Sequence, residues 1–140
     1  MTDTRVDTVE TEAAEPRTPF DALGGHAAIR AVVERFYDLM DRDPAYAELR
    51  AMHAPDLAPM RASLAGFLAG WSGGPRDWFE ANPGKCMMSM HSRFAISGKV
   101  ARQWSDAMRR AIEGAGIANP RMAEEFAGVM ERLAMGMARD

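Results

Sequence analysis

The 140-residue chain is long enough to bury the core of one domain and too short for two. Its composition, 47% apolar and 26% charged, is typical of globular domains, and no apolar run approaches the roughly 20 residues of a membrane span. Residues 1–17 hold five acidic and two basic side chains, which leaves fifteen of each sign in the remainder, so no basic excess attracts nucleic acid or an anionic membrane.

Residues 1–17 are predicted to form a disordered acidic tail, ahead of a single domain over residues 18–140. This tail has neither the apolar segment of a signal peptide nor the Arg-rich pattern of a transit peptide. Cys86 is the only cysteine, so the chain has no internal disulfide and no zinc site built from cysteines. We therefore expect a cytoplasmic protein.

Helix-forming residues dominate the chain, and β-branched residues are sparse. After a short turn at residues 20–23, apolar residues recur every three or four positions in several segments, as they do in amphipathic helices. The predicted helices cover residues 26–41, 44 to about 52, 57–71, a short segment around residue 91, 98 to about 114, and 120–137. The pattern indicates an all-α domain of unequal helices.

Two expectations about these helices concern their ends and their buried faces. Asp43, Asp56, Ser97 and Asn119 are candidate N-caps, and residues 76–86 are expected to be an irregular connection. The side chains expected to face inward on the two apolar stripes are Leu57, Met60, Leu64, Phe67, Leu68 and Trp71, then Met122, Phe126, Val129, Met130, Leu133 and Met137.

One histidine stands in a run of methionines and other apolar residues, MMSMHSRFAI at residues 87–96. In a helix, Met87, Met88 and Phe94 would lie on the same side as His91. A neutral imidazole among polarisable apolar groups suits a flat apolar cofactor with one open metal coordination position, such as haem. A lone histidine on an apolar face also fits a hydrogen-bonded core residue.

Two further side chains carry a polar group on an apolar helix face. Tyr37 and Trp104 are predicted to point inward from different helices, where a hydroxyl or an indole N–H needs a partner. A backbone carbonyl is the ordinary partner, but two such donors would also suit a bound polar diatomic molecule. His26, at a helix start, is expected on the surface, and His53, at a helix-ending turn, is either a surface residue or part of a pocket.

Several landmarks resemble, in order and spacing, those of the truncated haemoglobins, specifically group II. They are FDALGG at residues 20–25, Arg35-Phe36-Tyr37, Asp43-Pro44, Phe67-Leu68 before WSGGP at 71–75, HSRFAI at 91–96, and Arg102-Gln103-Trp104 with Met108. The tyrosine, Gly-Gly-Pro, histidine and tryptophan together make the match specific. It runs from Phe20 to about Leu133 and implies a 2-on-2 helical sandwich around haem b, iron protoporphyrin IX.

The resemblance also implies a role for each matching residue. His91 would be the proximal haem ligand, and Tyr37 and Trp104 would donate hydrogen bonds to a bound ligand on the distal side. His53 would be a third distal donor. The residues expected to contact the haem are Phe36, Met60, Leu64, Phe67, Met90, Phe94 and Met108.

The chain departs from the family pattern in the loop before His91. Where the family has Gly-His-Pro, with an arginine next to the ligand, this chain has Gly-Lys-Cys at residues 84–86 and Met90. A propionate of the haem would then be bound by Lys85, Arg61 or Arg93, and the sequence does not choose among them.

The resemblance implies a globin that coordinates O2, and other small diatomics such as NO or CO, at ferrous iron. The alternative is a haem enzyme that uses bound O2 to oxidise nitric oxide, as a nitric oxide dioxygenase, or that consumes peroxide, as a peroxidase. Since the chain has no flavin or nicotinamide motif, such turnover would need an external reductase. A third reading is a cofactor-free helical interaction domain.

Overall fold

The structure, a computed structural model, describes residues 18–85, 91 and 94–138. Every regular element in this part of the chain is a helix, as predicted: α2 (Pro19–Leu23), α3 (Gly25–Arg42), the 3-10 helix η1 (Pro44–Tyr46), α4 (Ala47–Ala51), α5 (Ala58–Trp71), α6 (Asp77–Ala81), α8 (Gly98–Gly114) and α9 (Pro120–Gly136). None of these helices has both the length and the apolar character needed to cross a membrane. The expected tail over residues 1–17 and most of the helix expected around residue 91 lie outside the described residues.

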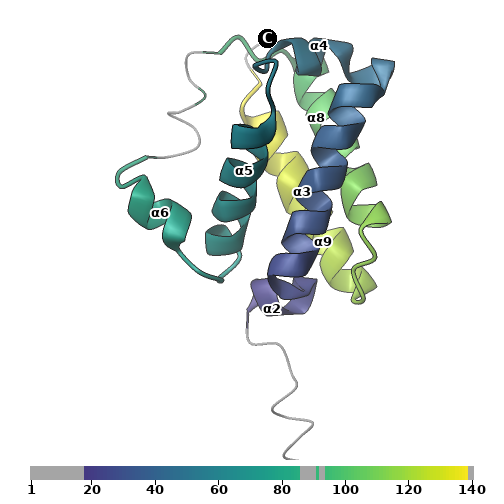
Figure 1. The fold of residues 1–140 in the computed structure, drawn as a ribbon. Helices are drawn as coiled ribbons and strands as arrows, with labels where there is room; N and C mark the ends of the chain where they lie inside the picture. Colours follow the sequence, from purple (N-terminus) through teal and green to yellow (C-terminus); the bar gives the residue numbers. More distant parts are fainter. Residues whose placement is uncertain (1–17, 86–90, 92–93, 139–140) are drawn as a thin grey trace, which may run out of the picture.

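The four longest helices form two antiparallel pairs (Figure 1). One pair is α3 with α5 and the other is α8 with α9, and α3 also packs on α8, which joins the two pairs. At one end, α2 contacts α3 and α9. At the other end, η1 and α4 connect α3 to α8. The arrangement is the 2-on-2 helical sandwich that the sequence led us to expect.

The core lies where α3 meets its neighbours. The side chains that α3 buries follow the predicted steps of three and one: Ile29, Val32, Val33, Phe36, Tyr37 and Met40. On α8 the buried set includes Ala107, Met108, Ala111 and Ile112. Three of the four predicted caps form: Asp43 accepts from the Ala45 N–H at 2.9 Å, Ser97 from the Val100 N–H at 3.1 Å and Asn119 from the Met122 N–H at 3.1 Å. The prediction for Asp56 is wrong, because α5 begins one residue later than expected and its N-cap is Leu57.

Three of the predicted inward positions are wrong, and one of them is Met60, which is 39% exposed at the start of α5. Trp71 is 39% exposed and Leu133 is 37% exposed. Trp71 is the last residue of α5, and one of its faces meets the ring of Phe126, with centroids 6.3 Å apart, while the rest stays accessible. The buried face of α9 is centred on Met130 and Ala134, so Leu133 falls at its edge.

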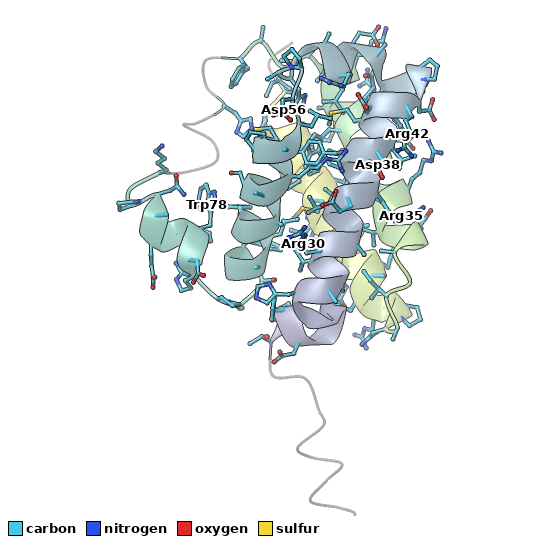
Figure 2. All side chains as sticks on the ribbon, in the orientation of Figure 1. Arg30, Arg35, Asp38, Arg42, Asp56 and Trp78 are labelled. Carbon is cyan, nitrogen blue, oxygen red and sulfur yellow. The ribbon has the colours of Figure 1, made fainter. Side chains whose placement is uncertain are left out.

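The segment over residues 76–86, expected to be irregular, contains α6. Its aromatic residues pack on α5 at two glycines one turn apart, which share a helix face. A Cβ atom on Gly66 would lie 3.1 Å from the Cβ of Trp78, and one on Gly70 would lie 2.6 Å from a ring carbon of Phe79. Figure 2 shows Trp78 between α6 and α5. A helix of this length is too short to show a periodic apolar pattern in the sequence. It is also too short to be stable alone, so its packing on α5 stabilises it.

We expect Gly70→Ala to destabilise the fold. The added methyl group would meet the Phe79 ring and lie 3.2 Å from the Pro75 carbonyl oxygen, so α6 must move. Overpacking of this kind costs about 1–3 kcal/mol, which lowers the melting temperature of a domain of this size by about 3–9 °C. Gly114→Ala is the control, because the atoms nearest to its methyl group would belong to the guanidinium of Arg35, the far end of an exposed flexible side chain. Equal melting temperatures for the two variants in thermal circular dichroism would contradict this account.

Candidate functional site

Three parts of the fold bring four aromatic rings together. Phe36 and Tyr37 come from α3, Trp104 comes from α8, and His53 follows α4. The Phe36 ring packs edge to face on Tyr37 and on Trp104, with centroids 4.9 and 5.1 Å apart. The rings of Tyr37 and His53 are 6.1 Å apart. Four residues that the sequence singled out therefore lie around one point, and Met108 is buried one turn after Trp104 on α8.

Two hydrogen-bond donors in this cluster have no partner among the described residues. Tyr37 is 2% exposed, yet neither its hydroxyl nor the indole N–H of Trp104 bonds to any described residue. In the same part of the chain, no fully enclosed side-chain nitrogen or oxygen lacks a partner. Both donor atoms therefore reach a space that a small molecule can enter.

Burial keeps the Tyr37 hydroxyl protonated. It raises the pKa of Tyr37 to about 12, although the positive charge of Arg61 acts in the opposite direction. The guanidinium of Arg61 lies 5.8 Å from the centre of the Tyr37 ring. At neutral pH the phenol thus remains a donor.

The imidazole of His53 is held in one tautomer. Its Nδ1 lies 2.9 Å from the Leu49 carbonyl oxygen. A carbonyl can only accept, so this contact is a hydrogen bond with the proton on Nδ1, and the neutral ring then has no proton on Nε2. Burial lowers the pKa of His53, the Leu49 bond raises it, and the positive charge of Arg50 lowers it further. A donor role for His53, expected from the sequence, would require the imidazolium form.

The helix that leads into His53 is fixed to α8 by a side-chain bridge. Gln103 accepts a hydrogen bond from the Leu49 N–H at 3.1 Å and donates one to a carboxylate oxygen of Glu48 at 2.8 Å. Lys99 reaches the other oxygen of Glu48 at 2.7 Å. The Leu49 carbonyl, which orients the His53 ring, is therefore positioned by α8, the helix that carries Trp104.

Arg50 fixes the turn on the other side of His53. It donates to the carbonyl oxygens of Ala54 and Pro55 at 3.0 and 2.9 Å and to a carboxylate oxygen of Asp41 at 2.9 Å. The histidine is thus held on both sides along the chain.

A buried tyrosine that sequence reasoning missed ties η1 to α8. The Tyr46 hydroxyl donates to Asp106 at 2.5 Å and accepts from Arg110 at 2.9 Å. Arg110 also donates to Asp43 at 2.9 Å. The only sequence signal was an aromatic residue just after the Asp43 cap, in a helix too short to show a period.

Arg61, one of the three candidates for a haem propionate, is occupied by acidic residues of α3. It donates to Glu34 at 2.5 Å and to Asp38 at 2.9 Å, which pins α5 to α3 beside Tyr37. Lys85 is exposed, and Arg93 lies outside the described residues. Of the described candidates, Lys85 is the one without a carboxylate partner.

The remaining candidate contacts differ in burial. His91 is half-buried in a turn, with the ring of Phe94 6.1 Å away, and Phe94 is 46% exposed. Met60, expected to face inward, is 39% exposed at the start of α5. Leu64 is half-buried, and Phe67 is buried against the aromatic rings of α6. Met90 lies outside the described residues.

Comparison with known proteins places this chain in a family. The family model of the bacterial-like globins matches residues 18–139. A group II 2-on-2 haemoglobin from the plant pathogen Agrobacterium tumefaciens is 34% identical, with a TM-score of 0.84, over 89% of this chain and 96% of that one. A cold-adapted truncated haemoglobin from the Antarctic marine bacterium Pseudoalteromonas haloplanktis TAC125 is 30% identical, with a TM-score of 0.83, over 89% of this chain and 99% of that one.

A third solved structure, the group II truncated haemoglobin from Bacillus anthracis, is 26% identical, with a TM-score of 0.79, over 89% of this chain and 98% of that one. The matches span nearly the whole of each relative, so the resemblance is one of complete domains and not of a shared helix pair. The chain therefore belongs to the bacterial-like globin family, the truncated haemoglobins, and has their all-α 2-on-2 fold.

Proposed function

We propose that this chain binds haem b through His91 and uses it to bind O2 and other small diatomic molecules. Haem supplies, when bound, an iron atom with one coordination position open to such a ligand. The observation that carries the proposal is a pair of donors, Tyr37 and Trp104, whose rings pack on the same Phe36 ring and whose donor groups have no partner among the described residues. A polar ligand that accepts from these donors would add hydrogen bonds that the described part of the chain does not make itself.

The side chains around this space suit a flat apolar group. Phe36 and Met108 are buried beside Trp104, and Phe67 is buried on α5. Met60 and Phe94 are large apolar side chains that stay exposed, as expected for contacts that a bound cofactor covers. A neutral imidazole at His91 offers the nitrogen that haem iron requires.

The distal residues would orient and retain a polar ligand. Because the Phe36 ring contacts both Tyr37 and Trp104, the two donors are fixed before a ligand enters. Each preorganised donor contributes about 0.5–1.5 kcal/mol to a neutral acceptor and more to a charged one. We therefore expect slow release of O2.

The direct test is a hemin titration of the purified chain. We expect an equimolar complex with a Soret absorption band and with helix content equal to or above that of the haem-free protein. A chain that stays colourless in excess hemin would contradict the proposal and favour the cofactor-free helical interaction domain.

One observation favours a second function, a detoxifying haem enzyme supplied by an external reductase. Tyr37, Trp104 and His53 place three polar groups around one space, and a ligand held by several of them reacts before it leaves. Stopped-flow measurements separate the two functions. A storage protein releases O2 faster than nitric oxide consumes it, whereas a nitric oxide dioxygenase shows the reverse order.

A further inference from the structure

We infer that the acidic segment of this chain over residues 7–15 docks on a groove along α3, where it pairs with two arginines, Arg35 and Arg42. The groove is a surface feature outside the cluster of Tyr37, His53 and Trp104, so the inference stands or falls apart from the proposed function. The occupant is a segment of the same chain, and charge holds it in place.

The groove follows α3 to the start of η1 and has a volume of about 420 Å³. Its lining residues are Arg35, Asp38, Leu39, Arg42, Asp43 and Pro44. The two arginines are nearly two full helical turns apart and therefore share one face of α3. Figure 2 shows both of them on the same side of this helix.

The groove is positively charged, because its carboxylates already have partners and its arginines do not. Asp38 accepts a hydrogen bond from Arg61 at 2.9 Å, and Asp43 accepts one from Arg110 at 2.9 Å. The two arginines of the groove are exposed, and neither forms an ion pair within the part of the chain that the structure describes. Two positive charges are thus available to an acidic partner.

The segment over residues 7–15, DTVETEAAE, has the complementary charge. It contains four carboxylates and no lysine or arginine, while residues 18–140 carry as many basic as acidic side chains. In the polyproline II conformation, residues three positions apart, such as Asp7 and Glu10, lie on one side about 9 Å apart. Arg35 and Arg42 are separated by about 10 Å along the axis of α3, so the two spacings match.

The segment is long enough to reach both arginines. It precedes Thr18, the N-cap of α2, and α2 packs on α3. From the first residue of α3, the helix rises about 15 Å to Arg35 and about 26 Å to Arg42. At about 3.1 Å per residue, Glu10 extends about 25 Å from Thr18 and Asp7 about 34 Å. Pairing Glu10 with Arg35 and Asp7 with Arg42 therefore leaves about 8–10 Å for the path around α2.

The contact should depend strongly on salt. Exposed ion pairs are individually weak, but the covalent link to α2 keeps the segment at an effective concentration in the millimolar range. The screening length is about 30 Å at an ionic strength of 0.01 M and about 3 Å at 1 M. Docking should therefore prevail at the lower ionic strength and be lost at the higher one.

The test is cleavage of the full-length chain after Glu12 by a glutamate-specific endoproteinase at an ionic strength of about 0.01 M. Cleavage follows the population of the undocked segment, so a segment docked about 70% of the time is cleaved about threefold more slowly than a free one. We expect the double variant Arg35→Glu with Arg42→Glu to be cleaved about threefold faster than wild type. The variant Asp7→Asn with Glu10→Gln, which leaves the described domain intact, should show the same acceleration.

Two further variants test whether the groove itself is responsible. Arg121→Glu with Arg132→Glu makes the same change in charge at two exposed arginines of α9 and should be cleaved at the wild-type rate. Adding Asp7→Arg with Glu10→Arg to the groove variant reverses both sets of charges and should restore slow cleavage. At about 1 M salt all these proteins should be cleaved at one rate.

Circular dichroism equal to wild type would show that the variants fold. Cleavage of wild type at the rate of the groove variant would overturn the inference and leave the groove for a separate acidic partner. Equal acceleration in the α9 variant would overturn it as well, because overall charge would then be the cause. Protection of wild type that grows with protein concentration would show that the segment binds a second copy of the chain instead of its own groove.

Discussion

Replacing His91 with glycine is expected to remove most of the haem affinity and leave the helical fold in place. His91 lies in a turn outside the helices and is half-buried, while the core is made by α3, α5, α8 and α9. The loss of a residue that only orients a metal ligand costs about 10–100-fold in metal affinity, so loss of the ligand should cost more than about a hundredfold. A hemin titration followed at the Soret band measures the affinity, and circular dichroism measures the fold.

Two controls separate coordination from packing. His26→Ala removes an exposed imidazole at the start of α3 and should leave haem affinity unchanged. Imidazole added to the His91→Gly protein should restore haem binding, because the free molecule can occupy the space of the lost side chain and supply the same nitrogen. Full retention of haem by His91→Gly, without imidazole, would show that another group holds the iron.

The parts of the fold that sequence reasoning predicted are those in which local chemistry and tertiary packing agree. Helices α3 and α8 have long apolar stripes at helical spacing, and Ser97 caps the second of them as expected. Helix α6 has no such stripe. It forms because Trp78 and Phe79 fit against two glycines of α5, a relation between segments that no periodicity records.

The same division holds for the candidate site. The inward direction of Tyr37 and Trp104 follows from their places on apolar stripes, so the sequence was enough to bring them together. The proton-accepting form of His53 depends on the Leu49 carbonyl, and the occupation of Arg61 depends on two acidic residues of α3. Hydrogen bonds to the backbone and between helices leave no signature in residue spacing.

Tyr37→Phe is expected to speed the release of O2 from the haem-loaded protein by about tenfold or more. The change removes one hydroxyl from the site and keeps the ring that packs on Phe36. A hydrogen bond to a charged acceptor contributes about 1.5–3 kcal/mol, and each 1.4 kcal/mol is a factor of about ten. Because the hydroxyl has no partner among the described residues, its removal should also leave the free energy of unfolding of the haem-free protein nearly unchanged.

Tyr46→Phe gives the opposite pair of results and is the matched control. That hydroxyl is bonded to Asp106 and Arg110, so its loss should lower the free energy of unfolding by about 1 kcal/mol and leave the O2 dissociation rate as it is. If both variants lost stability and neither released O2 faster, the Tyr37 hydroxyl would have a structural partner in solution. Comparing the two variants therefore tests whether the Tyr37 hydroxyl binds a ligand while the Tyr46 hydroxyl stabilises the fold.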